Sequence, residues 1–458
     1  MSNSLYKSLK QFSHHDKTSF HMPGHKNGAG FSSRFKNNAF ELDVTEFAET
    51  DDLQNPTSIL LDAQARAATA FGAEKSFYIT SGSTTGLLAA ILGTVKRGEK
   101  LIVDRTCHKA VISAIIMGGI DPVFIDADFD EVHGIYCGIN NNSLLNILSE
   151  NEDVVGAIIT SPTYYGICSD IKAIADSLHK AGKFLIVDEA HGSHFVFNEK
   201  LPNTALELGA DVCIQSLHKT LPALGQSSLL HIGKTDLVDI NSIENHLRLL
   251  HTTSPSYMIM ASMDEAILKM QQDTKNFEKL IDLVINLKTK IDVVGKLKCL
   301  KSNDFQNQYD ILRLVVNFEN IGISGYDACE VLNRVYGIYP ELADNKNVVF
   351  IITIGNTKKD IDSLETALEE MTITDFEPKT IKPQMKLPSI NLCFSPHRAW
   401  NSESETVRIQ DANDKICAEI VASCPPGCAI LVPGQMIDAD TIAYITEQTA
   451  IKYVKTII

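Results

Sequence analysis

The sequence predicts an α/β fold built on a doubly wound, mostly parallel sheet. Short apolar runs such as 101–103 and 154–160 alternate with helical segments and glycine-rich turns. Two later runs end in polar residues: Asp188 follows one, and Lys219 lies just past the end of the next. Ligands of open α/β sheets bind outside the carboxyl ends of the strands, so we expect a functional site there.

The composition fits a globular enzyme. The chain has 458 residues, 44% hydrophobic and 21% charged, and its length suggests about three domain-sized units. No apolar run approaches the ~20 residues of a membrane span. The N-terminus lacks an apolar signal core, so we expect a cytoplasmic protein with no membrane partner. The net charge of −16 argues against a nucleic-acid partner and is compatible with a cationic substrate.

The ten cysteines are scattered, and most lie inside apolar runs, where a free thiol behaves as a small hydrophobic group. Only Cys424 and Cys428 lie close together. With no second pair and no histidine pattern nearby, we interpret Cys424-Pro-Pro-Gly-Cys428 as a turn and expect no metal site.

The first part of the chain contains a helix N-terminus suited to an anion. We expect a helix at 4–12, a turn-rich loop at 20–28, an acidic loop at 43–56, a helix at 58–71 capped by Thr57 or Ser58, and a strand at 76–80. Ser81-Gly-Ser-Thr-Thr-Gly86 then opens an apolar helix at 87–95. Free backbone N–H groups and the helix dipole would favour a phosphate there. The alternative is a simple Ser/Thr cap.

The remaining elements predict the domain organisation. Further strands are expected at 101–103, 122–125, 154–160, 184–187, 212–214 and 227–232, the last of which could run antiparallel, with helices at 110–117 and 171–181. Helices at 258–270, 278–291, 328–335 and 359–371 and strands at 312–317 and 348–353 indicate a smaller α+β lobe. A linker at 377–388 precedes a turn near 411–414, a helix through 417–422 and an apolar run at 429–432. We therefore divide the chain into an N-terminal arm and helix (1–70), a large domain (71–256), a small lobe (257–380) and a C-terminal domain (385–458).

An acid after one strand and a lysine after the next is the arrangement that pyridoxal phosphate chemistry needs. A lysine holds the aldehyde as a Schiff base, and a carboxylate keeps the pyridine nitrogen protonated so that the ring can accept electrons. For Lys219 alone, the alternative is a solvated surface lysine. Together with Asp188 and the phosphate-binding turn, Lys219 predicts a pyridoxal 5′-phosphate site.

Eight segments carry a family resemblance: His21-Met-Pro-Gly-His-Lys26, Ser81-Gly-Ser-Thr-Thr85, Asp104-Arg-Thr-Cys-His-Lys109, Ser161-Pro-Thr-Tyr-Tyr-Gly166, Asp188-Glu-Ala-His191, Ser216-Leu-His-Lys219, His251-Thr-Thr-Ser-Pro255 and Pro425-Pro-Gly-Cys-Ala-Ile-Leu-Val-Pro-Gly434. Through them the chain resembles the ornithine/lysine/arginine decarboxylase family over essentially its whole length. The resemblance implies a fold-type-I, aspartate-aminotransferase-like large domain with a mostly parallel seven-stranded sheet, a small α+β lobe and an appended C-terminal domain. It also implies the compact form, without the receiver-like domain of enlarged members.

The resemblance implies roles for the matched residues. Lys219 would be the Schiff-base lysine, Asp188 the partner of the pyridine nitrogen, and His108 the ring that stacks on the cofactor. His191 would lie near the cofactor's phenolic oxygen or the substrate carboxylate. The phosphate would be held by Ser83, Thr84, Ser216 and His218.

The resemblance also implies partners. Thr252 and Thr253 would reach the phosphate of a neighbouring subunit, which implies a homodimer with shared active sites and leaves higher assembly open. Candidates for the carboxylates that meet a small cationic amino acid are Glu49, Asp51, Asp52 and Glu341, with a solvated acidic loop as the alternative.

The implied reaction is decarboxylation of a basic L-amino acid to its polyamine-pathway amine and CO₂, with arginine favoured over lysine or ornithine. An aminotransferase on the same fold is the rival, but its usual Asn-Pro turn is replaced by Ser161-Pro-Thr163. A catalytically silent binding homologue would also keep the fold. The intact set of Lys219, Asp188 and His108 argues against it.

Overall fold

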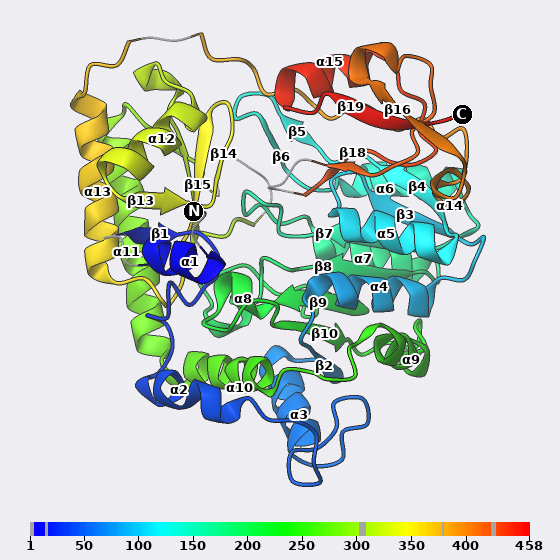
Figure 1. Cartoon of the computed structure of the whole chain (residues 1–458), viewed down its shortest axis with the longest axis horizontal. Helices are drawn as coiled ribbons and strands as arrows, with labels where there is room; N and C mark the ends of the chain where they lie inside the picture. The colour runs from blue at the N-terminus through cyan, green and yellow to red at the C-terminus, as the bar shows by residue number, and fades with distance from the viewer. Residues whose placement is uncertain (1–3, 14–16, 302–307, 378–379, 423–426) are drawn as a thin grey trace.

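The computed structural model describes residues 4–13, 17–301, 308–377, 380–422 and 427–458. Its largest sheet has seven strands in the order β2-β10-β9-β8-β7-β3-β4 (Figure 1). The strands are β2 (Lys75–Ile79), β3 (Lys100–Asp104), β4 (Asp121–Ile125), β7 (Val154–Thr160), β8 (Phe184–Asp188), β9 (Val212–Ser216) and β10 (Ser228–Ile232). Only β10 pairs antiparallel within this sheet, with β2 and β9, so the predicted mostly parallel sheet is confirmed.

Helices cover both faces of this sheet. One face packs against α4 (Ser83–Thr94), α5 (Lys109–Gly118) and α9 (Ile240–Leu250), and the other against α6 (Asn141–Glu150) and α7 (Ile171–Lys180). In β8, Ile186 joins the first apolar cluster, whereas Leu185 and Val187 join the second. Burial on both faces is the reason these strands read as unbroken apolar runs.

A second sheet forms the smaller lobe. It is antiparallel, in the order β11-β12-β15-β14, from β11 (Lys298–Cys299), β12 (Arg313–Asn317), β14 (Leu342–Ala343) and β15 (Asn347–Ile351). Helices α12 (Gly325–Val335) and α13 (Lys358–Ile373) pack with it.

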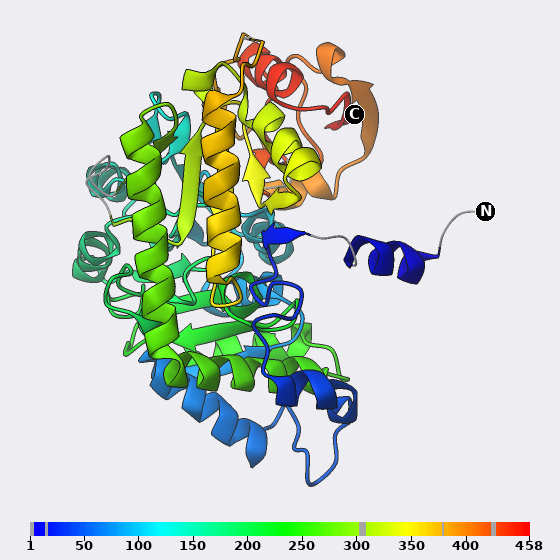
Figure 2. The same cartoon turned by 90° about the vertical axis from the view of Figure 1, so that its left-hand side faces the viewer.

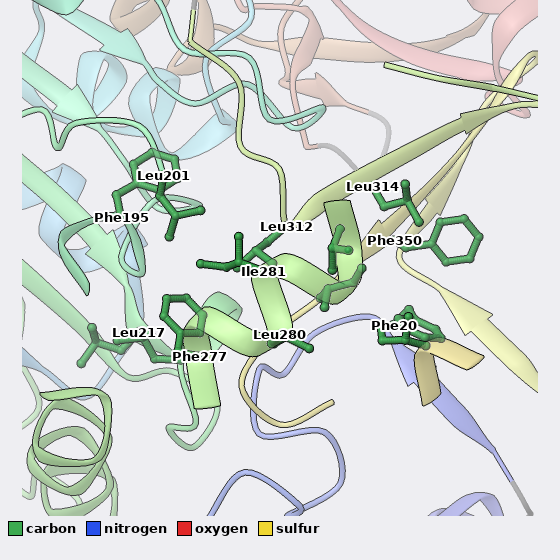
Figure 3. Close-up of a cluster of buried hydrophobic side chains, with 14 of the residues drawn as sticks. Phe20, Phe195, Leu201, Leu217, Phe277, Leu280, Ile281, Leu312, Leu314 and Phe350 are labelled. Atoms are coloured by element: carbon green, nitrogen blue, oxygen red, sulfur yellow. The ribbon is translucent and has the colours of Figure 1, made fainter. Parts of the chain in front are cut away.

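The two sheets share one apolar core. Helices α10 (Tyr257–Gln272) and α11 (Thr274–Val294) join the two parts. Figure 3 shows Phe277 and Ile281 of α11 between Leu217, which directly follows β9 of the large sheet, and the small-lobe residue Leu314. Because side chains from both parts belong to one buried cluster, the small lobe holds a fixed position against the large sheet.

The N-terminal segment comprises α1 (Leu5–Ser13), β1 (Thr18–Phe20) and α2 (Ser33–Asn38). Strand β1 pairs in parallel with β13 (Ile338–Pro340) of the small lobe. Helix α1, dark blue in Figure 2, stands out from the body of the molecule. In the described part of the chain, every helix is too short or too polar to cross a lipid bilayer.

The C-terminal part differs from the prediction at 417–422, where a helix is expected. It contains α14 (Pro396–Trp400), β16 (Ser404–Arg408), β17 (Val421–Ala422), β18 (Ala429–Leu431), α15 (Ala439–Gln448) and β19 (Tyr453–Ile457). The helix predicted at 417–422 is wrong: the backbone N–H of Cys417 donates to Gln435 O at 2.8 Å, and β17 pairs with β18. Backbone bonding to distant segments outweighs the local pattern of so short a run. Of the turn predicted at 424–428, residues 424–426 lie outside the described residues.

A buried guanidinium fastens the C-terminal part to the large sheet. Arg105, 3% exposed, follows β3 and donates through Nη2 to Ile430 O and Pro388 O, each at 3.0 Å. Its Nη1 donates to Ala429 O. Burial lowers the pKa of Arg105, and its bonding partners here are carbonyl oxygens. The loop after β3 is therefore tied to the strand β18.

We expect Arg105→Met to loosen β18. Each buried carbonyl left without its donor costs about 1–3 kcal/mol. Hydrogen exchange at 429–431 should quicken tenfold or more, since about 1.4 kcal/mol corresponds to a factor of ten.

The matched control is Arg97→Met, because Arg97 also reaches the C-terminal part, through His397 Nε2 at 3.1 Å, but from the exposed surface. Equal exchange rates at 429–431 in both variants would refute the proposal that Arg105 holds β18 in place.

Candidate active site

A cavity of about 270 Å³ lies at the carboxyl ends of β8 and β9 and the N-terminus of α4. Its lining includes eight of the residues predicted from the sequence: Ser83, Thr84, His108, Asp188, His191, Ser216, His218 and Lys219. These come from four separate strand–helix junctions. The expectation that polar residues at strand ends gather in one place is met, while their individual roles stay predictions.

One end of the cavity has the features of an anion site. Helix α4 begins at Ser83, four residues before the predicted start, and its N-cap Gly82 has no side chain to satisfy the first N–H groups. Ser83 Oγ lies 2.6 Å from Ser216 Oγ and 3.0 Å from Ser228 Oγ. The Thr84 side chain also lines the cavity. Hydroxyl groups and open backbone N–H groups suit a phosphate better than the alternative of a simple side-chain cap.

His218 lies at the same end of the cavity, as a neutral ring with its proton on Nδ1. Its Nδ1 donates to Ser227 O at 2.9 Å, and burial lowers its pKa to about 4. In the neutral ring, Nε2 then carries a lone pair and cannot donate. A bound phosphate would favour the imidazolium form, in which Nε2 can donate as well.

Asp188, which is buried, and Lys219, which is half-buried, both line the cavity. Lys219 lies on the single-turn helix α8 (Leu217–Thr220) directly after β9, and Asp188 is the last residue of β8, 4% exposed. Burial lowers the pKa of Lys219, and the Asp188 carboxylate partly opposes this shift. Lys219 Nζ lies 3.1 Å from His191 Nε2. The solvated-lysine alternative is therefore wrong.

His108 is held by the helix that follows it. It is the N-cap of α5, and its Nδ1 accepts the backbone N–H of Ala110 at 3.2 Å. Burial lowers the pKa of His108, so the ring is neutral with its proton on Nε2. A flat, neutral, half-buried ring is suited to stacking on another ring.

The acidic loop before α3 (Ile59–Phe71) does not line the cavity. The carboxylate of Asp51 accepts the backbone N–H groups of Asp52, Thr57, Ser58 and Leu60. Burial raises the pKa of Asp51, but these bonds outweigh it and hold the pKa below its usual range. Asp51 thus serves as the cap of α3. Ser58 holds the N-cap position of α3 as predicted, but its side chain makes no cap bond, and the Asp51 carboxylate supplies it instead. The substrate role of Asp51 stays a prediction. Glu49 and Asp52, on the same loop, are likewise absent from the cavity wall of their own chain, as far as the described residues show.

Glu341 is the acidic candidate that the fold brings next to the cavity. Its Oε1 accepts the hydroxyl of Tyr164, which lines the cavity, and its Oε2 accepts Met22 N–H at 2.8 Å. Thr252 and Thr253, in contrast, are exposed after α9 and do not line their own chain's cavity.

Sequence reasoning assigned no role to three residues near this site. They are Tyr164, Lys26 and Arg313. Lys26 is buried, donates to His21 O and Ile351 O, and has its pKa lowered by burial to about 7, although Glu341 opposes the shift. Arg313 Nη2 lies 3.0 Å from His191 Nδ1. Tyr164 and Lys26 lie inside quoted motifs, but the only signal for Arg313 was a charge within an apolar strand.

Two family models match the chain. Residues 3–311 match "Orn/Lys/Arg decarboxylase, major domain", and residues 382–454 match "Orn/Lys/Arg decarboxylase, C-terminal domain". An arginine decarboxylase of Halalkalibacterium halodurans is 34% identical, covering 97% of this chain and 92% of the relative. An arginine decarboxylase of Bacillus subtilis is 32% identical, covering 96% and 92%.

Solved structures share the fold. A lysine decarboxylase of Francisella novicida superposes with a TM-score of 0.77 at 19% identity, covering 99% of this chain and 80% of that one. An alanine–glyoxylate aminotransferase from Nostoc gives 0.58 at 14% identity, covering 78% and 95%. At these identities the likeness shows the fold alone, which decarboxylases and aminotransferases share.

Proposed function

Because the chain belongs to the Orn/Lys/Arg decarboxylase family, whose members use pyridoxal 5′-phosphate, we propose that the amino acid it decarboxylates is arginine. Decarboxylation of a basic amino acid follows from the family. The choice of arginine rests on one observation: the relatives named arginine decarboxylase that are 32–34% identical match this chain over 92–96% of their own length. Relatives named lysine decarboxylase are 23–28% identical.

The donor set of the cavity fits this cofactor. Its phosphate would lie against Ser83, Thr84, Ser216 and His218. Asp188 would hold a proton on the pyridine nitrogen, and His108 would face the ring. When bound, pyridoxal phosphate supplies the electron sink for the bond pair that departing CO₂ leaves behind. A Lys219 amine enclosed beside His191 supports its assignment as the residue that bonds the aldehyde.

Exclusion of water and proton transfer would be carried out by the side chains around Lys219. Burial in this cavity keeps water from the reacting carbon and strengthens each charge–charge interaction. Lys219 Nζ or His191 Nε2 is the candidate to return a proton to the α carbon after CO₂ has left, since both atoms are titratable and adjacent.

Glu341 is our candidate for the far end of the substrate. A guanidinium pairs with a carboxylate through two parallel N–H···O bonds, which a lysine ammonium cannot reproduce. Each Glu341 oxygen has accepted one bond, from Tyr164 or Met22, and retains a second lone pair.

We also propose a homodimer whose active sites are shared. Thr252 and Thr253 are exposed and follow α9, whose Leu249 is 79% exposed. An apolar side chain beside two exposed hydroxyl groups supports a contact with a second copy of the chain.

A decarboxylation panel tests the substrate. We expect CO₂ release from L-arginine with a kcat/KM at least tenfold above that for L-lysine or L-ornithine, and no amino transfer to a keto acid. Glu341→Gln should lower kcat/KM for arginine ten- to hundredfold, the equivalent of about 1.5–3 kcal/mol for a charge-assisted bond.

Glu330→Gln is the matched control, because Glu330 is exposed on α12 and pairs only with Arg334 among the ion pairs of the described residues. A preference for lysine or ornithine would overturn the substrate proposal.

Borohydride reduction tests the cofactor lysine. We expect the reduced adduct on Lys219, found by peptide mapping, and its loss in Lys219→Ala. Lys26 is an internal control, because its amine is also buried and its pKa is also lowered, to about 7, but it does not line the cavity. An adduct on Lys26, or none, would reject the assignment.

Replacing both Thr252 and Thr253 with alanine tests the shared site. Ligand bound across an interface stabilises the assembled form. The double variant should bind the cofactor more weakly, so at a given cofactor concentration its monomer fraction in sedimentation should exceed that of the wild type, whereas the two apoproteins should sediment alike. Wild-type protein that is saturated with cofactor and sediments as an active monomer would exclude sharing.

A further inference from the structure

The His191 imidazole lies between two cationic side chains. Its Nε2 is 3.1 Å from Lys219 Nζ, and its Nδ1 is 3.0 Å from Arg313 Nη2. Arg313 comes from the small lobe, 122 residues away in the chain. The edge of the ring meets Tyr164 with centroids 4.8 Å apart, so its orientation is set by packing as well.

The chemistry of the three groups fixes the position of the ring proton. A guanidinium has donors only, so Nδ1 must accept. A neutral imidazole carries one proton, which must then lie on Nε2. Nε2–H can face Lys219 Nζ favourably only if that nitrogen offers a lone pair. Lys219 is then an amine and not an ammonium ion.

Arg313 has few other ways to bond. It is 1% exposed, and its Nε and Nη1 have no acceptor among the described residues. The backbone around it is also fixed: Arg313 N–H donates to Asp310 O at 3.0 Å, and Arg313 O accepts the Tyr309 hydroxyl. His191 Nδ1 is thus the acceptor that the described structure offers to this guanidinium, and losing it would leave Nη2, a buried donor, without an acceptor.

We propose that Arg313 is a positioning residue that fixes His191 as the Nε2–H tautomer and thereby holds Lys219 as the neutral amine. The proposal rests on the role of Lys219 proposed above. Only a neutral amine can attack an aldehyde carbon, because an ammonium ion has no lone pair; the C=N bond forms and the carbonyl oxygen leaves as water.

Burial and the charge of Arg313 favour the neutral form of both His191 and Lys219, whereas two carboxylates oppose this at Lys219. Burial, followed by the charges of Lys219 and Arg313, lowers the pKa of His191 well below its usual value. Burial also lowers the pKa of Lys219; Arg313 adds to that shift, while Asp188 and Glu341 oppose it. The remaining titratable groups that act on His191 are the imidazoles His108 and His218, whose own pKa values are lowered by burial.

Nitrogen-15 NMR of full-length protein labelled at histidine, free of cofactor, tests the tautomer directly. We expect His191, assigned by its loss in His191→Phe, to show a protonated Nε2 and a bare Nδ1 at neutral pH. Arg313→Met should abolish this single tautomer, and Arg313→Lys, which keeps a donor and a charge, should restore it in part. A wild-type His191 protonated on Nδ1, or on both nitrogens, would overturn the proposal even if the Arg313 variants fail to fold.

A second measurement distinguishes the effect of the Arg313–His191 hydrogen bond on Lys219 from the effect of the Arg313 charge. The rate at which apoprotein captures pyridoxal phosphate, followed by absorbance, should rise with the fraction of neutral Lys219. Arg313→Met should move the midpoint of this rate profile to higher pH by about one unit, the scale of a lost charge or hydrogen bond. In the His191→Phe background the same substitution should move it less. Equal shifts in both backgrounds would show that Arg313 acts by charge alone and would refute its action through His191.

The two proposals can fail separately. If the borohydride-reduced adduct is found on a residue other than Lys219, the proposed function of Lys219 is rejected, whichever tautomer His191 adopts. If the adduct is on Lys219 but His191 carries its proton on Nδ1, only the proposed role of Arg313 is rejected.

Discussion

The enclosure of the Lys219 amine at the end of β9 is the constraint on which the site depends. A charged ammonium would be costly in so buried a position, so its surroundings must either pair it or keep it neutral. Asp188 favours the charged form, whereas burial and Arg313 favour the neutral one. The site therefore balances a carboxylate of the large sheet against a guanidinium of the small lobe, with the His191 ring between that guanidinium and the amine.

This balance needs the two lobes to be held in place. Arg313 begins β12, whereas His191 follows β8, and a second polar contact joins the same two segments, between His194 Nε2 and Asp310 Oδ1 at 3.1 Å. Their alignment comes from the core that α11 shares with both sheets, in which Phe277 and Ile281 are buried. The distance of 3.0 Å between Nη2 and Nδ1 thus depends on this apolar packing and on the neighbouring contact of His194 with Asp310.

The sequence predicts most of the large sheet because strands buried on both faces appear as unbroken apolar runs, and it predicts Lys219 and Asp188 because they end such runs. The sequence does not indicate a role for Arg313, because the run 312–317 has the pattern of an ordinary buried strand. The partner of Arg313, His191, lies 122 residues away in the chain. The capping role of Asp51 was not predicted, because an acid in a polar loop has the same sequence pattern whether it binds a ligand or accepts backbone N–H groups. Helices α6, α9 and α15 were not predicted, and the helix predicted at 417–422 fails because bonding to Gln435 is a tertiary effect.

The C-terminal part also belongs to the site, through the loop that follows β3. Within four residues this loop carries Arg105, which bonds to the backbone at 388 and 429–430, and His108, which lines the cavity. Cys428 lines the same cavity, and Lys109 N–H donates to Gly427 O at 3.0 Å. A shift of β18 would therefore reach the His108 ring through the Arg105 side chain and this backbone bond. The large domain and Cys428 thus line the cavity, while the small lobe contacts two of the lining residues, His191 through Arg313 and Tyr164 through Glu341.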